Sequence, residues 1–217
     1  MEAKLKSLIL HRAETERLGA FSCFDFTDFA SYKTVSKCLE RLEDDKKISR
    51  VLPGIYRLRE VDSELGLPIP PSVDEAVAAV ARKNMWEICP TGDAALNAFG
   101  LSTQVVASYV YLSTGPYKKY TIGKSLVLLK HTMNRELLSY SRVTCLMVQA
   151  IKTLGQARFN DETKRIMAAK LSDEEKRNAL FETTRVRSWI RRIIVDVCGI
   201  CNESVAKEKE RTKGGHI

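Results

Sequence analysis

Five basic side chains lie between residues 46 and 59, in a stretch that ends with ISRVLPGIYRLR. A Pro-Gly pair divides it into two runs of β-prone residues, which predicts a hairpin with strands at 48–52 and 55–58. Basic residues on a hairpin can neutralise nucleic-acid phosphates. They also protect exposed strand edges against aggregation, so the hairpin alone leaves both interpretations open. The residues that we expect to contact phosphates are Lys47, Arg50, Arg57 and Arg59.

A second set of polar side chains precedes the hairpin, on a helix predicted at about 34–45. Apolar residues recur there at i, i+3, i+4 and i+7 and define a stripe that should be buried. Residues opposite this stripe would face a DNA groove, because recognition helices read bases mostly through their N-terminal part. The expected contact residues are Tyr32, Lys33, Thr34, Ser36 and Lys37.

The preceding elements must support the hairpin, because an isolated two-stranded hairpin is marginal in water. Residues 2–17 have the pattern of an amphipathic helix that ends near Gly19. Thr27 is a suitable N-cap for a short helix at 28–30, and a turn is expected at 31–33. The order helix, short helix, helix, hairpin predicts a winged helix-turn-helix domain at residues 1–60.

The charge of the chain is positive and uneven. Its net charge is +8 over 217 residues, with +2 in residues 1–60, −4 in 61–114 and +10 in 115–217. A basic protein favours polyanionic partners, and two separate basic regions predict two binding surfaces. No apolar run is long enough to span a membrane and no signal peptide is evident. We therefore expect a cytoplasmic protein with no membrane partner.

The remainder of the chain predicts a second domain. Residues 61–72 hold three of the six prolines and have the composition of a linker. Residues 73–133 predict a mixed region, with a helix at 73–82 and strands at 86–89, 105–113 and 120–130. Residues 134–200 predict mainly helices, including a capping box at 172–175. The expected fold class is α/β (α+β), a winged helix-turn-helix followed by a mixed domain at 73–217 with a helical C-terminal third.

Two short motifs that could carry metal or nucleotide chemistry lack their partners. Cys198 and Cys201 have CxxC spacing, but a zinc site needs four ligands and no second pair of ligands is present. Gly123-Lys124-Ser125 lacks the earlier glycine of a Walker loop, and a β-turn within a hairpin is the favoured interpretation. No catalytic constellation surrounds the three histidines. We expect neither metal nor cofactor, and no enzymatic activity.

The sequence TRVRSWIRRII contains four arginines around a tryptophan near the C-terminus. On a helix, its apolar residues form one stripe with arginines on both flanks, and the favoured interpretation is a core-facing helix whose arginine stems cover its edges. The alternative is a docking face, because tryptophan and arginine are enriched in interface hot spots. The candidate partner-binding residues are Arg185, Arg187, Trp189, Arg191 and Arg192.

Several segments resemble the AbiEi-like antitoxins of bacterial AbiE-type (type IV) toxin–antitoxin systems. They are ISRVLPGIYRL at 48–58, SVDEAVAAVARK at 72–83, PTGDAALNAFGLSTQV at 90–105 and VYL at 110–112. The resemblance implies an N-terminal winged helix that binds inverted repeats in its own promoter and represses the operon. It also implies a C-terminal domain that helps to neutralise a toxin of nucleotidyltransferase type.

Two other function classes remain open at this point. One is a transcriptional regulator whose C-terminal domain binds a small ligand or dimerises. The other is a nucleic-acid-modifying enzyme that a winged helix directs to its substrate. A nucleotidyltransferase gene directly downstream would favour the antitoxin, whereas turnover of nucleotides would favour the enzyme.

Overall fold

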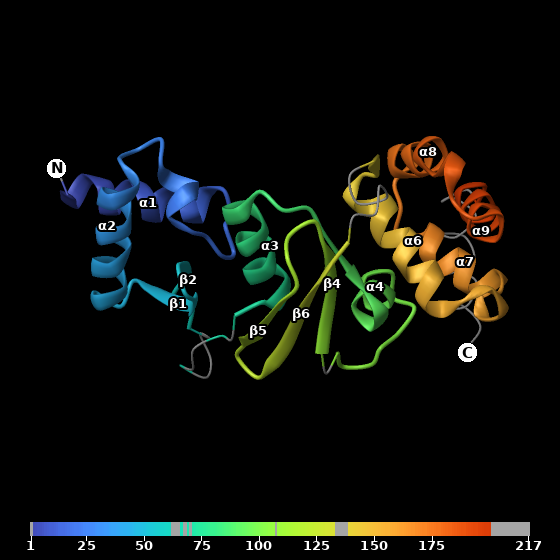
Figure 1. Cartoon of the computed structure of the whole chain (residues 1–217), viewed down its shortest axis with the longest axis horizontal. Helices are drawn as coiled ribbons and strands as arrows, with labels where there is room; N and C mark the ends of the chain where they lie inside the picture. The colour runs from blue at the N-terminus through green and yellow to red at the C-terminus, as the bar shows by residue number, and fades with distance from the viewer. Residues whose placement is uncertain are drawn as a thin grey trace, which may run out of the picture. The chain divides into compact units, whose positions relative to one another are not determined.

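The computed structural model of the chain describes residues 2–61, 66, 69, 71–106, 108–132 and 139–200 (Figure 1). Contacts divide the chain into two compact units, Met1–Ile88 with Lys119–Val127, and Cys89–Lys118 with Leu128–Ile217. The protein combines helices with two sheets and is α+β, as predicted. In the part of the chain that the structure describes, no helix has both the length and the apolar character needed to cross a membrane.

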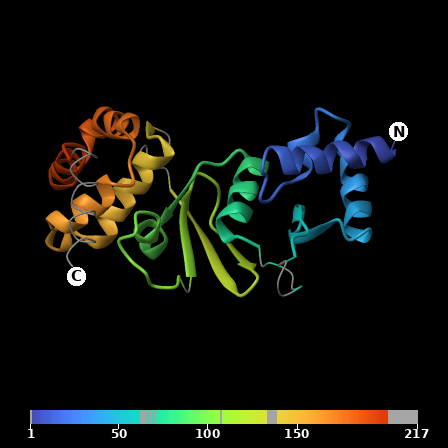
Figure 2. The same ribbon diagram turned by 180° about the vertical axis from the view of Figure 1, so that it is seen from behind.

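The first unit begins with the predicted order of a winged helix-turn-helix. Helix α1 (Glu2–Thr15) is followed by the 3-10 helix η1 (Cys23–Phe26), helix α2 (Tyr32–Asp44) and strands β1 (Ile48–Leu52) and β2 (Ile55–Leu58). Helix α2 runs across α1 in both views of the ribbon (Figures 1 and 2).

The short helix between α1 and α2 lies earlier than predicted. Ser22, not Thr27, caps it: the Ser22 hydroxyl accepts from the backbone N–H of Phe24, and Asp25 accepts from the Ser22 N–H at 2.7 Å. Ser31, expected in a turn, is the N-cap of α2. The error arose because several residues near 22–31 can act as caps, and only the packing of Phe21 and Phe26 into the core selects Ser22.

The hairpin is supported by a third segment of backbone. Strands β1 and β2 pair antiparallel, with Ile48 opposite Leu58. The N–H and C=O of Phe21 exchange hydrogen bonds with those of Tyr56, both at 2.8 Å. Ile48 and Tyr56 also pack into the apolar cluster of α1 and α2. The wing is therefore fixed to the helices by backbone bonds as well as by side-chain burial.

Helix α3 (Val73–Asn84) belongs with the first unit, although we expected it to open the second domain. Its Arg82 donates to the carbonyl of Ala20 at 2.7 Å and to Oδ1 of Asp25 at 3.1 Å. These bonds connect residues far apart in the sequence, and composition alone does not predict them. The contacts thus group α3, together with Lys119–Val127, with the winged helix in the first unit.

The second sheet has four strands in the order β3-β4-β6-β5. They are β3 (Ile88–Thr91), β4 (Ser108–Ser113), β5 (Lys118–Ile122) and β6 (Ser125–His131), and α4 (Gly92–Ala98) follows β3. The single strand predicted at 120–130 is interrupted by a turn in which Gly123 has a φ of 58°. Gly123-Lys124 therefore forms the turn of a β-hairpin, as predicted.

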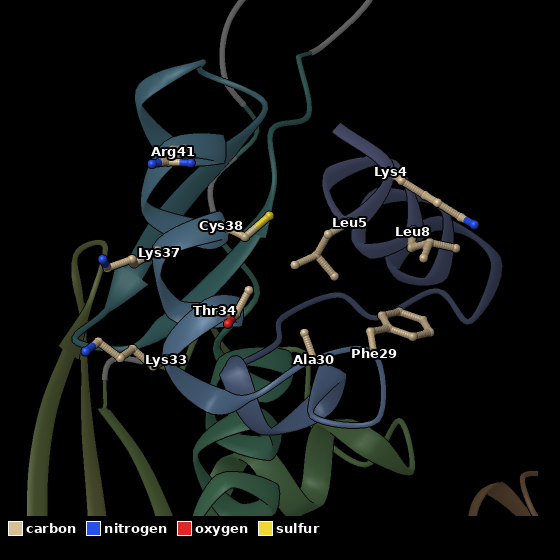
Figure 3. Close-up of a pocket in the computed structure, with 10 residues that line it drawn as sticks. All are labelled: Lys4, Leu5, Leu8, Phe29, Ala30, Lys33, Thr34, Lys37, Cys38 and Arg41. Carbon is tan, nitrogen blue, oxygen red and sulfur yellow. The ribbon is translucent and has the colours of Figure 1, made fainter. Parts of the chain in front are cut away.

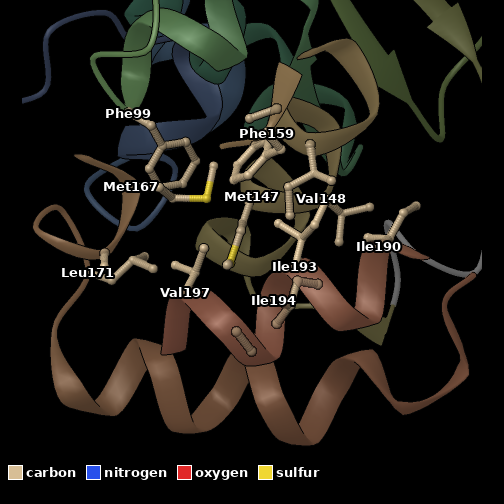
Figure 4. Packing of buried hydrophobic residues seen from close by; sticks show 14 of the residues in the cluster. Phe99, Met147, Val148, Phe159, Met167, Leu171, Ile190, Ile193, Ile194 and Val197 are labelled. Carbon is tan, nitrogen blue, oxygen red and sulfur yellow. The ribbon is translucent and has the colours of Figure 1, made fainter. Parts of the chain in front are cut away.

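The C-terminal third is helical, as predicted. It comprises α6 (Arg142–Leu154), η2 (Gln156–Arg158), α7 (Asp161–Ala168), α8 (Asp173–Glu182), η3 (Thr183–Arg185) and α9 (Ser188–Cys198). The capping box of Ser172 and Glu175 begins α8. Phe99, Met147, Met167 and Val197 are among the side chains that converge in the core of these helices (Figure 4).

Candidate nucleic-acid interface

Helix α2 is fixed by one apolar face and by its N-terminal cap. Val35, Cys38, Leu39 and Leu42 are each at most 2 % exposed and form the predicted buried stripe. The Ser31 hydroxyl accepts a hydrogen bond from the backbone N–H of Thr34 at 3.4 Å. Burial of the stripe sets the rotation of the helix, and this rotation decides which side chains reach solvent.

The exposed side of α2 is basic. Lys33 and Lys37 are exposed and lie one turn apart, and Arg41 continues the row a further turn along the helix (Figure 3). Among the described residues, no carboxylate lies within ion-pair distance of Lys33 or Lys37. Both ammonium groups are thus available to a nucleic-acid phosphate or to the acceptor atoms of a base edge.

The other three predicted residues of α2 divide into two kinds. Tyr32 is 49 % exposed and its ring packs on that of Phe24, with centroids 5.1 Å apart. Thr34 is exposed, and its hydroxyl lies 2.9 Å from that of Ser31. Ser36 is half-buried and turned toward η1.

Ser36 lies near the thiol of Cys23, a residue of η1. Burial raises the pKa of this thiol, and hydrogen bonds with Ser36 and Tyr32 oppose that rise. Because the Ser36 hydroxyl has an internal partner, its predicted role in base contact receives less support from the structure than the roles of Lys33 and Lys37.

In the wing, Arg50 is held by a carboxylate of α2. Its Nη2 and Nε donate to Oε2 of Glu43 at 2.8 and 3.1 Å, and its guanidinium carbon lies 5.4 Å from the centroid of Tyr56. The hydrogen bond with Glu43 raises the pKa of Arg50. Arg50 is still 48 % exposed, so a phosphate can reach it, but it must share the guanidinium with Glu43.

The prediction that Arg57 contacts DNA is contradicted by its burial. The Arg57 side chain is 7 % exposed, and its Nη2 donates to Oε2 of Glu60 at 2.8 Å. Its Nη1 donates to the carbonyl of Ile69 at 3.1 Å. We expected the arginines of the hairpin to be held outward toward DNA, but the Arg57 guanidinium is instead occupied by Glu60 and by the carbonyl of Ile69.

Lys47 and Arg59 lie together at the base of the hairpin. The Arg59 N–H donates to the Lys47 carbonyl at 3.1 Å, and both side chains are exposed. They form a second cationic pair in the first unit, in addition to Lys33 and Lys37. The structure therefore keeps these four of the predicted basic residues as accessible cations.

Sequence reasoning missed two basic residues near α2. Lys4 of α1 and Arg41 of α2 line the same groove as Lys33 and Lys37 (Figure 3). The spacing of Arg41, four residues after Lys37, was a usable signal. No such signal existed for Lys4, because only the crossing of α1 over α2 brings it there.

The residues of the predicted C-terminal partner-binding set also fall into two groups, one packed at the core edge and one exposed. The Arg191 Nη1 donates to the carbonyl of Leu180 at 2.7 Å and to the hydroxyl of Thr183 at 2.8 Å, and Trp189 packs against the helical core. Both residues therefore belong to the core edge, the interpretation favoured by their pattern. Arg185, Arg187 and Arg192 are exposed.

The described residues contain no cluster of three or more His, Cys, Asp or Glu that could hold a metal ion. Cys201 and His216 lie outside the described residues. Cys89 and Cys145 are both buried, and the hydrogen bond between their thiols raises the pKa of Cys89 strongly. Raised thiol pKa values and burial are typical of inert structural cysteines.

The sequence profile of one protein family, described as a family of unknown function (DUF6088), matches residues 10–179. This match covers most of the chain, including α2, the wing and the four-stranded sheet. The curated proteins and the solved structures gave no match to the chain.

Proposed function

We propose that this chain, which belongs to the DUF6088 family, is a DNA-binding repressor that acts through its winged helix-turn-helix. Helix α2 would enter the major groove with its N-terminal part, and the hairpin would lie along the adjacent phosphate backbone. A protein of this kind acts by occupying DNA and carries out no turnover. Its site of action would be the cytoplasm.

The observation that carries the proposal is the pair of exposed lysines on α2. Lys33 and Lys37 stand opposite a fully buried stripe, on the helix that precedes a wing. Bases are read from side chains near the start of a recognition helix, and phosphates are bound by cations beside it. Tyr32 and Thr34 complete the exposed start of the helix, and Lys47 and Arg59 supply the backbone contacts.

The antitoxin role is a further proposal and rests on the resemblance to AbiEi-like proteins. On this proposal the chain binds inverted repeats in its own promoter, represses the operon and neutralises a toxin of nucleotidyltransferase type. Arg185, Arg187 and Arg192 are the exposed members of the predicted partner-binding set. Co-expression with the product of the gene directly downstream tests this role: rescue of growth supports it, and toxicity that persists with abundant soluble protein refutes it.

The DNA-binding proposal is tested by fluorescence anisotropy on duplexes from the region upstream of the gene, with scrambled duplexes as comparison. If about six phosphates are contacted, affinity should fall on the order of a thousandfold between 50 and 200 mM salt. Affinity that does not change over this range, or no binding at all, would refute the proposal.

Single variants assign the contacts. Lys33→Gln and Lys37→Gln should weaken binding and change the preferred sequence, and Lys47→Gln should weaken binding to all sequences and reduce the salt slope by about one. Lys124→Gln is the matched control, because it removes the same charge from an exposed turn that belongs neither to α2 nor to the wing. Equal losses in all four variants would show that net charge alone controls binding.

A further inference from the structure

Between α1 and α2 lies a groove with a volume of about 560 Å³. Small-molecule sites in proteins span about 300 to 1,000 Å³ and are mostly apolar, with a few charged groups that orient the ligand. The groove has this composition: Leu5, Leu8, Phe29 and Cys38 supply apolar surface, and Lys4, Lys33, Lys37 and Arg41 supply positive charge. In the part of the chain described, none of the residues that line it is acidic.

The apolar part of the groove is accessible and fixed. Leu8 remains 38 % exposed, whereas Leu5 is 8 % exposed and points into the groove opposite Cys38 (Figure 3). The Phe29 ring is covered on one face by the guanidinium of Arg12, whose carbon lies 3.8 Å from the ring centroid. Arg12 is itself held by Asp28 through two hydrogen bonds of 2.7 Å.

Because Arg12 already holds the Phe29 ring in place, little conformational entropy is lost at this side of the groove when a ligand binds. Lys4 comes from α1 and Lys33, Lys37 and Arg41 come from α2, and their charged ends lie at the outer rim of the groove (Figure 3). Apolar surface rimmed by cations fits an apolar chain with an anionic head, and does not fit a neutral or cationic amphiphile.

We infer that this groove binds a small amphipathic anion, an alkyl chain ending in a carboxylate or a phosphate, in competition with DNA. The competition rests on the proposed DNA-binding function, because Lys33 and Lys37 line the groove and also belong to the proposed reading face. A bound anion would pair with these ammonium groups and place negative charge where a DNA phosphate must approach. Occupancy of the groove would then release the operator.

Binding itself is measured by isothermal titration of the full chain with decanoate and with decyl phosphate, both below their critical micelle concentrations. Decanol and decyltrimethylammonium are the neutral and cationic comparisons. Saturable binding of one anion per chain, with no binding of the comparisons, is the expected result. A preference between the two anions identifies the head group. No saturable binding, or equal binding of decanol, would overturn the inference.

Variants place the ligand in the groove. Leu8→Glu and Lys4→Gln should weaken decanoate binding at least tenfold, because one adds a carboxylate to the apolar surface and the other removes a cation. The controls are Val105→Glu, at a valine that is 95 % exposed, and Lys124→Gln, which carry the same changes outside the groove. Circular dichroism confirms that each variant is folded. Unchanged binding by folded Leu8→Glu would overturn the assignment.

Anisotropy with labelled DNA separates this inference from the proposed function. Decanoate should raise the apparent Kd for DNA in proportion to one plus the ratio of decanoate concentration to its own Kd. If the chain binds decanoate but no DNA, the proposed repressor function is refuted, whereas the assignment of the groove as an anion site stands. Simultaneous binding of both ligands would overturn the competition. An acidic amphipathic peptide that displaces decanoate at much lower concentration would show that the groove serves a protein partner.

Discussion

The guanidinium of Arg50 on β1 donates from Nη2 and Nε to a single carboxylate oxygen of Glu43 on α2, at 2.8 and 3.1 Å. One ion pair thus connects the hairpin to helix α2. It also reduces the positive charge that the wing presents, because Glu43 occupies the fork that a phosphate would use. The structure therefore places an internal competitor for phosphate within the proposed DNA-binding surface.

Glu43→Gln should strengthen DNA binding. An exposed ion pair stabilises a fold by at most about 1 kcal/mol, so the variant should fold, and the released Arg50 should raise DNA affinity by up to about fivefold. Anisotropy titrations at fixed salt measure this change. In an Arg50→Gln background the same Glu43→Gln change should give a much smaller gain. An equal gain in both backgrounds would show that Glu43 acts only through its own charge.

Arg57 and Arg59 should affect different properties although they are two residues apart. Arg57→Ala removes hydrogen bonds to Glu60 and to the Ile69 carbonyl and should lower the free energy of unfolding by about 1.5 to 3 kcal/mol. Arg59→Ala removes an exposed side chain and should weaken DNA binding with little effect on stability. Urea unfolding and anisotropy, measured on both variants, test the contrast. A stable Arg57→Ala variant with reduced DNA affinity would restore Arg57 as a phosphate contact.

The stabilisation of the winged helix by the Arg12–Asp28 ion pair should be lost at low pH. The hydrogen bond from Arg12 holds the pKa of Asp28 below its ordinary value. Because the pKa is lower in the folded state, this stabilisation is present above the ordinary aspartate pKa of about 3.9 and is lost as the pH falls through the lower folded value. The unfolding free energies of wild type and Asp28→Asn should therefore converge as the pH falls through the lowered pKa of Asp28. Curves that stay parallel to the acid end of the folded range would refute the assignment.

Arg191 and Arg192 form a matched pair of arginines in the C-terminal helices. Arg191→Gln should destabilise the second unit by about 1 to 3 kcal/mol, because the carbonyl of Leu180 and the hydroxyl of Thr183 lose a charged donor. Arg192→Gln removes an exposed charge and should leave the free energy of unfolding within about 0.5 kcal/mol of wild type. Thermal unfolding followed by circular dichroism measures both. If the partner-binding proposal holds, only Arg192→Gln gives a stable protein with reduced toxin rescue.

The sequence by itself determined the elements whose signals are local. The stripe of Val35, Cys38, Leu39 and Leu42 fixed both the existence and the rotation of α2, because a helical period assigns each residue to a face. Pro53-Gly54 fixed the hairpin turn, and Ser172 with Glu175 fixed the start of α8. From these elements alone, Lys33 and Lys37 could be placed on the solvent side of α2.

Only the tertiary structure decided which basic residues remain accessible. Arg57 is buried and donates to the carbonyl of Ile69, and Arg191 donates to the carbonyl of Leu180. Lys4 reaches the α2 groove because α1 crosses α2, and Arg82 joins α3 to the first unit through Ala20 and Asp25. These contacts connect residues that are distant along the chain. Sequence periodicity reports which face of an element is apolar, but not which distant segment will cover a charge on the other face.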